Sequence, residues 1–286
     1  MSNYISDSSN THWLISNPAR TTRTGMDGKP FRCPFCPGNE EDTPPEIYWV
    51  GNGEANKPGW KIRVVPNMFP ITETHEVVIH SPDHEKNVEN FLPEHVEDII
   101  KTYINRFNFL KDKGKVFIFH NYSLISGASL IHPHSQITVI PNEIPTETLP
   151  VQPVVNILEQ VGEFISYCPE YSEWAYEIWI REITNNKSQI TNELQTSNFK
   201  DLNENQIKDL AKILQSSLIK LKKVHDGNPH YSKKPFGYNF YIYPYENWYL
   251  RIIPRFMERA GFELSTGIMV NSVSAEKAGE ELRKLI

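Results

Sequence analysis

Short apolar stretches interrupted by proline and glycine dominate the hydrophobic pattern of this chain. In the first half, four such stretches rich in β-branched and aromatic residues are only four or five residues long, which is typical of strands. They span 61–65, 76–79, 116–120 and 136–140, and a proline follows three of them closely. We therefore expect a β-sheet in the first half.

Two longer segments carry apolar residues at helical spacing instead. Pro93–Leu110 begins with a proline, which suits a first helical turn, and Asn203–Val224 ends in a lysine-rich turn, which complements the helix dipole. Two further helices are expected at 275–285 and, shorter, around 154–165. The apolar faces comprise Val96, Ile99, Ile100, Tyr103, Phe107 and Leu110 in the first helix, and Ile207, Leu210, Leu214, Leu218 and Leu221 in the second.

The order strand, helix, strand, strand occurs once in each half, which indicates an internal duplication. Chance similarity between short β-rich patterns is the alternative. Aligning the prolines that end the last strand of each half sets His134 opposite Asn247, so that one half would react and the other support it. A proline-containing stretch at 141–153 would join them. The paired segments are 75–79 with 176–180, 93–110 with 203–224, 116–119 with 240–243, and 137–141 with 250–254.

Composition and charge narrow the functional classes. The 286 residues allow one large domain or two of ordinary size. With 29 basic and 35 acidic side chains, the net charge of −6 argues against binding nucleic acid through its phosphates. No apolar run approaches the roughly 20 residues needed to cross a bilayer, so no membrane partner is expected. The first residues do not resemble a secretory signal, and a cytoplasmic location is therefore expected.

The segment His132-Pro133-His134-Ser135-Gln136 carries the strongest candidate chemistry. Side chains two apart on an extended segment share a face, unless the proline twists the chain and separates the histidines. Imidazole is a nucleophile at neutral pH, and a phosphoryl or nucleotidyl group bound to it can be passed on. The preceding turn, 127–129, could offer backbone N–H groups and a hydroxyl to phosphate, with Gln136 as an amide donor. The alternative is a histidine pair satisfied by backbone carbonyls.

Two of the three cysteines, Cys33 and Cys36, form a Cys-x-x-Cys pair. In a reducing compartment this spacing indicates a metal or redox site before a structural disulfide. A structural zinc site needs about four ligands, and Cys168 is the one other cysteine, so histidines must complete the set; His84 and His132 are the candidates. A reduced turn without metal and a redox pair are the alternatives.

Several motifs in register resemble the galactose-1-phosphate uridylyltransferase family of the histidine-triad superfamily. The similarity also includes 13–23 near the start and the segments 252–255, 260–263 and Asn271 near the end, so it spans nearly the whole chain. The motifs that carry it are Cys33-Pro34-Phe35-Cys36-Pro37-Gly38-Asn39-Glu40, Arg63-Val64-Val65-Pro66-Asn67, His75-Glu76-Val77-Val78-Ile79 with Ser81-Pro82-Asp83-His84, Asn121, Gly127-Ala128-Ser129 and His132-Pro133-His134-Ser135-Gln136.

This resemblance implies an α+β fold of two histidine-triad-like halves, 1–150 and 151–286, each an antiparallel sheet with a packed helix, often in homodimers. It implies a ping-pong nucleotidyltransferase: His134 attacks the α-phosphate of a nucleotide sugar, sugar 1-phosphate leaves, and a second phosphate-bearing acceptor takes the nucleotide. The implied roles are the nucleophile His134, phosphate contacts at Gln136 and Ser129 beside Gly127 and Ala128, nucleotide contacts at Asn67 and Asn121, arginines near phosphate at Arg20 and Arg23, and zinc ligands at Cys33, Cys36, His84 and His132.

The chain also departs from the family pattern. Asn247-Trp248-Tyr249 stands where the family has a second His-x-His pair, so a second metal site is not expected. Ser123 replaces a glycine of the phosphate loop; a serine suits ordinary backbone angles, so we expect this loop to differ in shape. The base remains open between uridine and adenosine. A nucleotide-conjugate hydrolase or phosphorylase, and a degenerate nucleotide-binding protein, remain as alternatives to the transferase.

Overall fold

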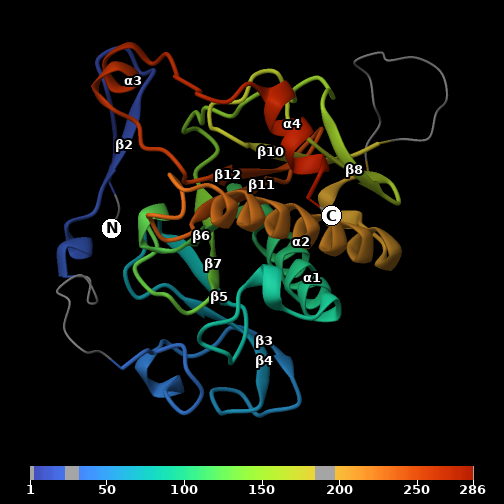
Figure 1. Ribbon diagram of the computed structural model, residues 1–286. Helices are drawn as coiled ribbons and strands as arrows, with labels where there is room; N and C mark the ends of the chain where they lie inside the picture. Colours follow the sequence, from blue (N-terminus) through green and yellow to red (C-terminus); the bar gives the residue numbers. More distant parts are fainter. Residues whose placement is uncertain (1–2, 23–31, 184–196, 286) are drawn as a thin grey trace. The chain divides into compact units, whose positions relative to one another are not determined.

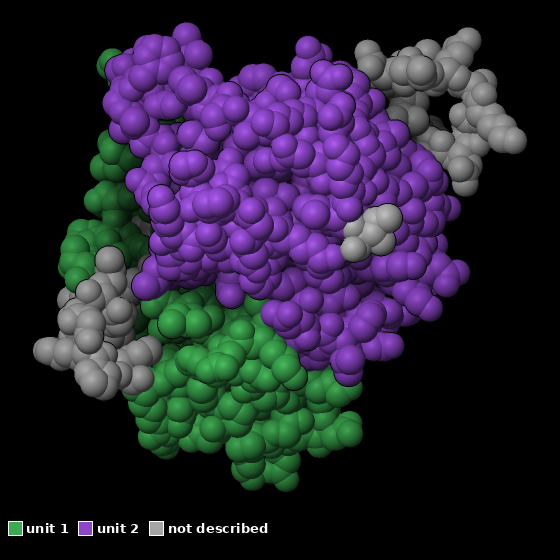
Figure 2. Space-filling view, in the orientation of Figure 1, with its two compact units in different colours: residues 1–87, 105–120, 129–149 green, residues 88–104, 121–128, 150–286 purple. Residues whose placement is uncertain are grey.

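The computed structural model describes residues 3–22, 32–183 and 197–285 and divides into two compact units. The first unit comprises 1–87, 105–120 and 129–149, and the second comprises 88–104, 121–128 and 150–286 (Figure 2). Each unit contains an antiparallel sheet with few helices, so the expected α+β class with antiparallel sheets is confirmed. In the described part of the chain, no helix is long and apolar enough to span a bilayer.

The sheet of the first unit has five strands in the order β3-β4-β5-β7-β6 (Figure 1). Its central strand pairs set the register around the candidate site, because Val77 lies opposite Gln136 and His75 opposite Thr138. A separate hairpin is formed by β1 (Asn3–Ser6) and β2 (Trp13–Ser16). The sheet strands are β3 (Tyr48–Gly51), β4 (Trp60–Pro66), β5 (Thr74–Ile79), β6 (Lys115–Tyr122) and β7 (His134–Ile140).

The sheet of the second unit repeats this strand order as β8-β9-β10-β12-β11. In the chain, α1 (Pro93–Leu110) connects β5 to β6, and α2 (Glu204–Gly227) connects β10 to β11. The topology of the two halves is therefore the same, while their common origin stays a prediction. The strands are β8 (Ile157–Val161), β9 (Phe164–Tyr167), β10 (Ile178–Glu182), β11 (Tyr238–Tyr243) and β12 (Tyr249–Pro254).

The predicted helical faces are buried, as their periodicity indicated. All six apolar residues listed for α1 and all five for α2 are less than a tenth exposed. In α2, the Asn203 side chain accepts from the backbone N–H groups of Asn205 and Gln206, and this cap starts the helix. Two shorter helices follow, α3 (Gly261–Thr266) and α4 (Ala275–Arg283), the second close to its predicted bounds.

The helix expected around 154–165 is wrong. This segment forms the hairpin of β8 and β9, which are joined at Gly162 and Glu163. Gly162 has a φ of 55°, a left-handed conformation that favours a tight turn over helix continuation. The apolar run was short enough to suit either structure, and cross-strand pairing decided between them.

Candidate active site

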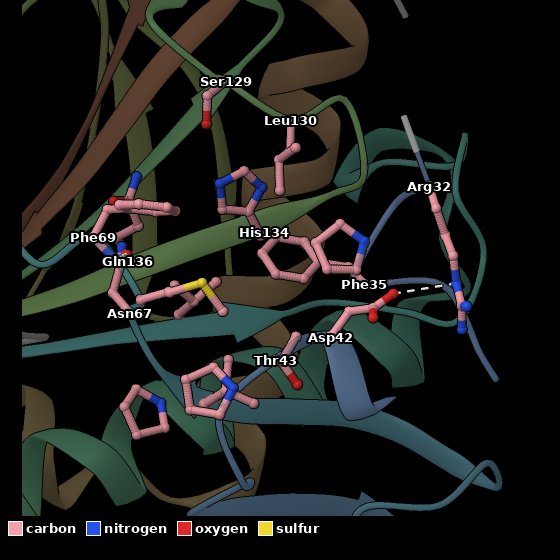
Figure 3. A pocket seen from close by; sticks show the side chains of 16 residues that line it. Arg32, Phe35, Asp42, Thr43, Asn67, Phe69, Ser129, Leu130, His134 and Gln136 are labelled. Atoms are coloured by element: carbon pink, nitrogen blue, oxygen red, sulfur yellow. Dashed lines mark hydrogen bonds and ion pairs between the residues drawn. The ribbon is translucent and has the colours of Figure 1, made fainter. Parts of the chain in front are cut away.

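A cavity of about 250 Å³ in the first unit is lined by side chains of β7, the loop before it and the segment after β4. His134 and Gln136 alternate with Ser135 along β7 and share the face toward the cavity (Figure 3). Phe35, Asn67 and Ser129 also line it. The structure therefore brings together four of the predicted site residues. Phe35, which stands between the two cysteines in the sequence, lines the same cavity.

The hydrogen bonds of His134 determine which ring nitrogen can react. Its Nδ1–H donates to the backbone carbonyl of His132 at 2.8 Å, so the lone pair of the neutral ring resides on Nε2. The edge of the ring packs against Phe35, with centroids 5.4 Å apart. His134 thus has the tautomer and the fixed ring that a nucleophile requires.

A second histidine, His120, supports the start of β7 from the neighbouring strand. Its Nδ1–H donates to the carbonyl of His134 at 2.9 Å. His120 is fully enclosed, and this burial lowers the pKa of its ring to about 3. The ring is therefore neutral at physiological pH, and it holds the backbone of His134 without adding charge.

The loop before β7 keeps a glycine-like shape despite its serine. Ser123 has φ 75° and ψ 155°, a conformation that side chains other than glycine rarely adopt, so the expectation of ordinary backbone angles at this position was wrong. Gly127 is left-handed at φ 83°, and the Ala128 N–H donates to the Ser123 carbonyl.

The Asn121 carboxamide oxygen accepts from Asn239. Asn121, Gly127 and Ala128 lie in the second unit, so their contact with a ligand at His134 stays a prediction.

Of the two predicted phosphate-facing arginines, the structure describes Arg20, which is not among the cavity-lining residues. Arg20 donates from Nη1 to the backbone carbonyl of Phe69, and Asn17 donates to the carbonyl of Pro70. Both side chains therefore brace the segment that carries Asn67, and a direct role of Arg20 toward phosphate stays a prediction. Arg23 lies outside the described residues.

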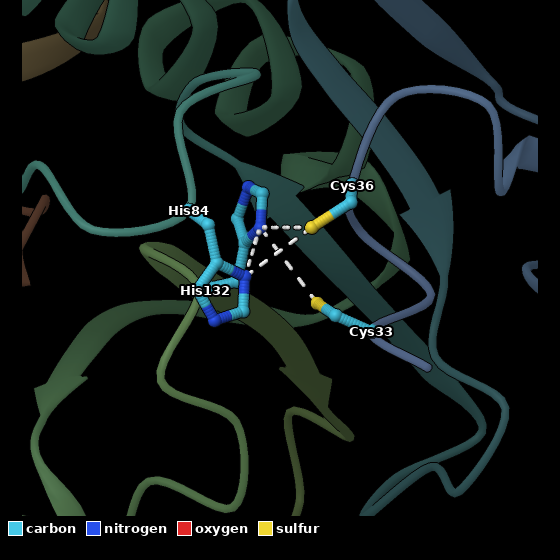
Figure 4. Close-up of side chains that lie close together, drawn as sticks. All are labelled: Cys33, Cys36, His84 and His132. Carbon is cyan, nitrogen blue, oxygen red and sulfur yellow. Dashed lines mark hydrogen bonds between the residues drawn. The ribbon is translucent and has the colours of Figure 1, made fainter. Parts of the chain in front are cut away.

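Cys33, Cys36, His84 and His132 come together although 99 residues separate the first from the last (Figure 4). The two Nδ1 atoms of the histidines are 3.3 Å apart, and the Nδ1 of His132 is 3.7 and 3.6 Å from the two sulfur atoms. A tetrahedral ion with bonds of about 2.0 Å to nitrogen and about 2.3 Å to sulfur places these pairs about 3.3 and about 3.5 Å apart. The group could hold a metal ion.

Interactions around this group prepare its atoms for a cation. His132 donates from Nε2 to the carbonyl of Ser81 at 2.7 Å, which leaves Nδ1 as the lone-pair nitrogen. Burial lowers the pKa of His132 to about 4 and raises the pKa of the Cys33 thiol to about 11. The imidazole is thus neutral, as a ligand must be, and a cation would be needed to hold Cys33 as a thiolate.

Glu40 holds the cysteine loop in place, a role that the sequence analysis missed. Its buried carboxylate accepts from Trp60 Nε1 at 2.8 Å and from the Gly38 N–H at 2.9 Å. The loop that carries Cys33 and Cys36 is therefore tied to β4, which starts at Trp60. The available signal in the sequence is a glutamate four residues after the second cysteine.

The second unit carries different side chains on the strand that corresponds to β7. Trp248 is buried against Phe164 and Phe199, and Tyr249 stacks on Trp179 with centroids 4.4 Å apart. Farther along β12, the buried Arg251 pairs with Glu177 at 2.7 Å. Aromatic packing and a buried ion pair occupy this part of the second sheet, and a supporting role for this half stays a prediction.

Comparison with known proteins agrees with these features. Residues 69–140 match the family described as galactose-1-phosphate uridyl transferase, N-terminal domain. An ADP-glucose phosphorylase from Arabidopsis thaliana is 27% identical over 96% of this chain and 90% of the relative. A galactose-1-phosphate uridylyltransferase from Thermotoga maritima is 24% identical over 95% of each. The resemblance to the galactose-1-phosphate uridylyltransferase family is confirmed.

A solved structure also matches the fold of this chain over its whole length. The crystal structure of an ADP-glucose phosphorylase from Arabidopsis thaliana with bound ADP-glucose aligns with a TM-score of 0.72 at 24% identity, covering 100% of both chains. The segment matched to the family's N-terminal domain contains β5, α1, β6 and β7. It therefore includes His84, His132, His134 and Gln136, while the two cysteines lie before it.

Proposed function

We propose that this protein is a nucleotidyltransferase that moves a nucleoside monophosphate group from a nucleotide sugar to a second phosphate-bearing acceptor through His134. The observation that carries the proposal is the hydrogen bond from His134 Nδ1–H to the carbonyl of His132, because it leaves Nε2 as the nucleophilic nitrogen of a cavity-lining ring. The similarity to nucleotide-sugar enzymes supports the same chemistry.

The proposed reaction has two steps. In the first, Nε2 of His134 attacks the α-phosphorus, an N–P bond forms, and the P–O bond to the sugar 1-phosphate breaks as this group leaves with the bonding electrons. In the second, a phosphate oxygen of the acceptor attacks the same phosphorus and the N–P bond breaks, which regenerates the imidazole. Gln136 and Ser129 would donate hydrogen bonds to phosphate oxygens, where charge accumulates in both transition states.

Zinc is the metal that best suits the group of two cysteines and two histidines. Cys33, Cys36, His84 and His132 would hold it, and its contribution would be structural: bound zinc joins the cysteine loop to the residue two positions before His134. The chain's own residues would then perform the chemistry. We expect about one zinc per chain, a homodimer and a cytoplasmic location.

Three acceptors are candidates for the second step. A sugar 1-phosphate would make the protein a uridylyltransferase-type enzyme, whereas inorganic phosphate would make it a phosphorylase. The 27% identity to an ADP-glucose phosphorylase over nearly the whole chain favours the second candidate, with an adenine nucleotide sugar as donor. Water as acceptor would make it a hydrolase.

The proposal is tested with UDP-glucose and ADP-glucose labelled at the α-phosphorus. The native protein should acquire label on histidine, whereas His134→Ala should not, and a control variant at the exposed His230 should label normally. Adding glucose 1-phosphate or inorganic phosphate to the isolated labelled protein then identifies the acceptor from the product released. Absence of label with both donors, with no labelled nucleotide product, would refute the proposal.

A further inference from the structure

His75 lies beside the proposed active site, next to Gln136. It is on β5, its side chain is 4% exposed, and its Nδ1 lies 2.8 Å from the backbone nitrogen of Ile71. A backbone N–H can only donate, so Nδ1 must be the accepting nitrogen. In the neutral ring, the proton therefore resides on Nε2.

This tautomer fixes the orientation of the Gln136 carboxamide. Nε2 of His75 is 3.0 Å from Oε1 of Gln136, and because Nε2 carries the proton, it donates to that oxygen. The carbonyl end of the carboxamide is thus turned toward His75, and its NH2 group is the end that remains for a ligand in the cavity that Gln136 lines. The opposite orientation would present an oxygen to an anionic ligand and lose this hydrogen bond.

The Asn67 carboxamide lies beside the same ring. The carboxamide oxygen of Asn67 accepts from the Phe69 N–H at 2.8 Å, so its NH2 group is the end that lies 3.2 Å from Nε2 of His75. Because the proton of Nε2 is directed to Gln136, His75 offers this NH2 group no lone pair. The hydrogens of Asn67 are then available to the cavity, which Asn67 also lines.

We infer that His75 is a positioning residue that orients the carboxamide of Gln136, and leaves the NH2 group of Asn67 unengaged by the ring, so that both amides present N–H donors to the phosphate groups of the bound nucleotide. The inference rests on the proposed function for the identity of the ligand. The tautomer of His75 and the orientation of Gln136 do not rest on it, because the hydrogen bonds of Nδ1 with the Ile71 N–H and of Nε2–H with Gln136 determine both. His75 acts through the Gln136 carboxamide and is not itself among the residues that line the cavity.

Two substitutions distinguish the role of Nδ1 from the role of Nε2. His75→Asn places an amide oxygen near the position of Nδ1, which can still accept from Ile71, and removes the donor to Gln136. His75→Gln places an amide nitrogen near the position of Nε2 and keeps that donor. Loss of the hydrogen bond from Gln136 to the charged phosphate corresponds to a decrease of about 10- to 100-fold in rate. His75→Asn should therefore slow labelling of His134 by about this factor. His75→Gln should recover most of that loss.

A double-mutant cycle distinguishes positioning from a general structural effect. If His75 acts through Gln136, His75→Asn should slow labelling much less in a Gln136→Ala background than in the native protein. Equal slowing in both backgrounds, or a His75→Gln variant as slow as His75→Asn, would overturn the inference.

A spectroscopic measurement keeps this test separate from the proposed function. If the native protein forms no labelled histidine, the proposed function fails, while the side-chain amide resonances of Gln136 still report its hydrogen bond to His75. These resonances, identified by their loss in Gln136→Ala, should shift in His75→Asn and stay near their native positions in His75→Gln. Unchanged resonances in His75→Asn would refute the positioning role whatever the activity.

Discussion

Replacing Glu76 by glutamine should cost the protein several kcal/mol of folding free energy. Glu76 lies next to His75 on β5 and is 4% exposed, and its carboxylate accepts two hydrogen bonds from Arg106 of α1, at 2.8 and 2.7 Å. Arg106 is itself 5% exposed. Glutamine has the same shape but no charge, and only one of its two terminal atoms is an oxygen. The substitution therefore leaves the buried guanidinium of Arg106 with one of its two acceptors from residue 76 and without the negative charge that balances it.

The expected loss is about 3–5 kcal/mol, because breaking a buried ion pair leaves one charge without compensation in an environment of low polarity. The geometry places this pair at the strong end of such interactions, since both bonds are charge-assisted and bidentate. Removing both charges is different: Glu76→Met combined with Arg106→Met should lose much less than the sum of the two single variants, since neither charge then remains buried.

Urea unfolding at pH 7, followed by tryptophan fluorescence, measures these differences in the free energy of unfolding. The exposed pair of Lys57 and Glu54 provides the control, because Glu54→Gln should change the free energy of unfolding by less than about 1 kcal/mol. A loss below about 1 kcal/mol for Glu76→Gln, or additive losses in the double variant, would refute the reasoning.

Three further predictions concern the loop, the buried histidine and the cysteines. Ser123→Gly should raise the melting temperature, measured by calorimetry, by about 1–4 °C. Glycine relieves a backbone conformation that costs a serine of order 1–3 kcal/mol, and the greater entropy of glycine in the unfolded chain offsets part of this gain. An unchanged or lower melting temperature would contradict the proposal that Ser123 is strained. Stability should fall as pH drops below about 6.5, because the pKa of His120 is about 3 in the folded protein and near 6.5 when unfolded, so that the unfolded state binds the extra proton. Urea unfolding at a series of pH values should show that His120→Gln reduces the slope of the native protein by up to about 1.4 kcal/mol per pH unit. Cys36→Ser should reduce the zinc content from about one per chain to near zero by metal analysis, whereas Cys168→Ser, which changes a buried cysteine outside the metal group, should keep it.

Local regularity explains which parts of the fold followed from the sequence. The apolar spacing of 93–110 and 203–224 identified α1 and α2, and short β-branched runs identified β5, β6 and β7, because these patterns depend on residues close together in the chain. The segment 154–165 shows the limit. Its apolar residues suit a short helix as well as two strands, and pairing between β8 and β9 decided the outcome.

The candidate site, like the fold, could be predicted only in part from the sequence. The types and order of its residues were evident from the sequence: a Cys-x-x-Cys pair, a His-Pro-His segment and a glutamine two residues later. Pro133 is a reason to expect that the two histidines separate, and the structure shows that separation, since His132 lies with Cys33, Cys36 and His84 while His134 lines the cavity. The part of Arg20 in holding the Phe69 carbonyl was not evident, because a guanidinium in a motif gives no indication of its partner.

By itself, the sequence determined the secondary structure of the regular segments, the repeated order of strands and helix, and the residue types able to carry nucleotidyl transfer. The tertiary structure alone decided which nitrogen of each histidine holds a proton, because that depends on the backbone carbonyl or N–H group that folding places beside it. A backbone carbonyl leaves the lone pair on Nε2 of His134 and on Nδ1 of His132, and the Ile71 N–H sets the His75 tautomer that orients the carboxamide of Gln136.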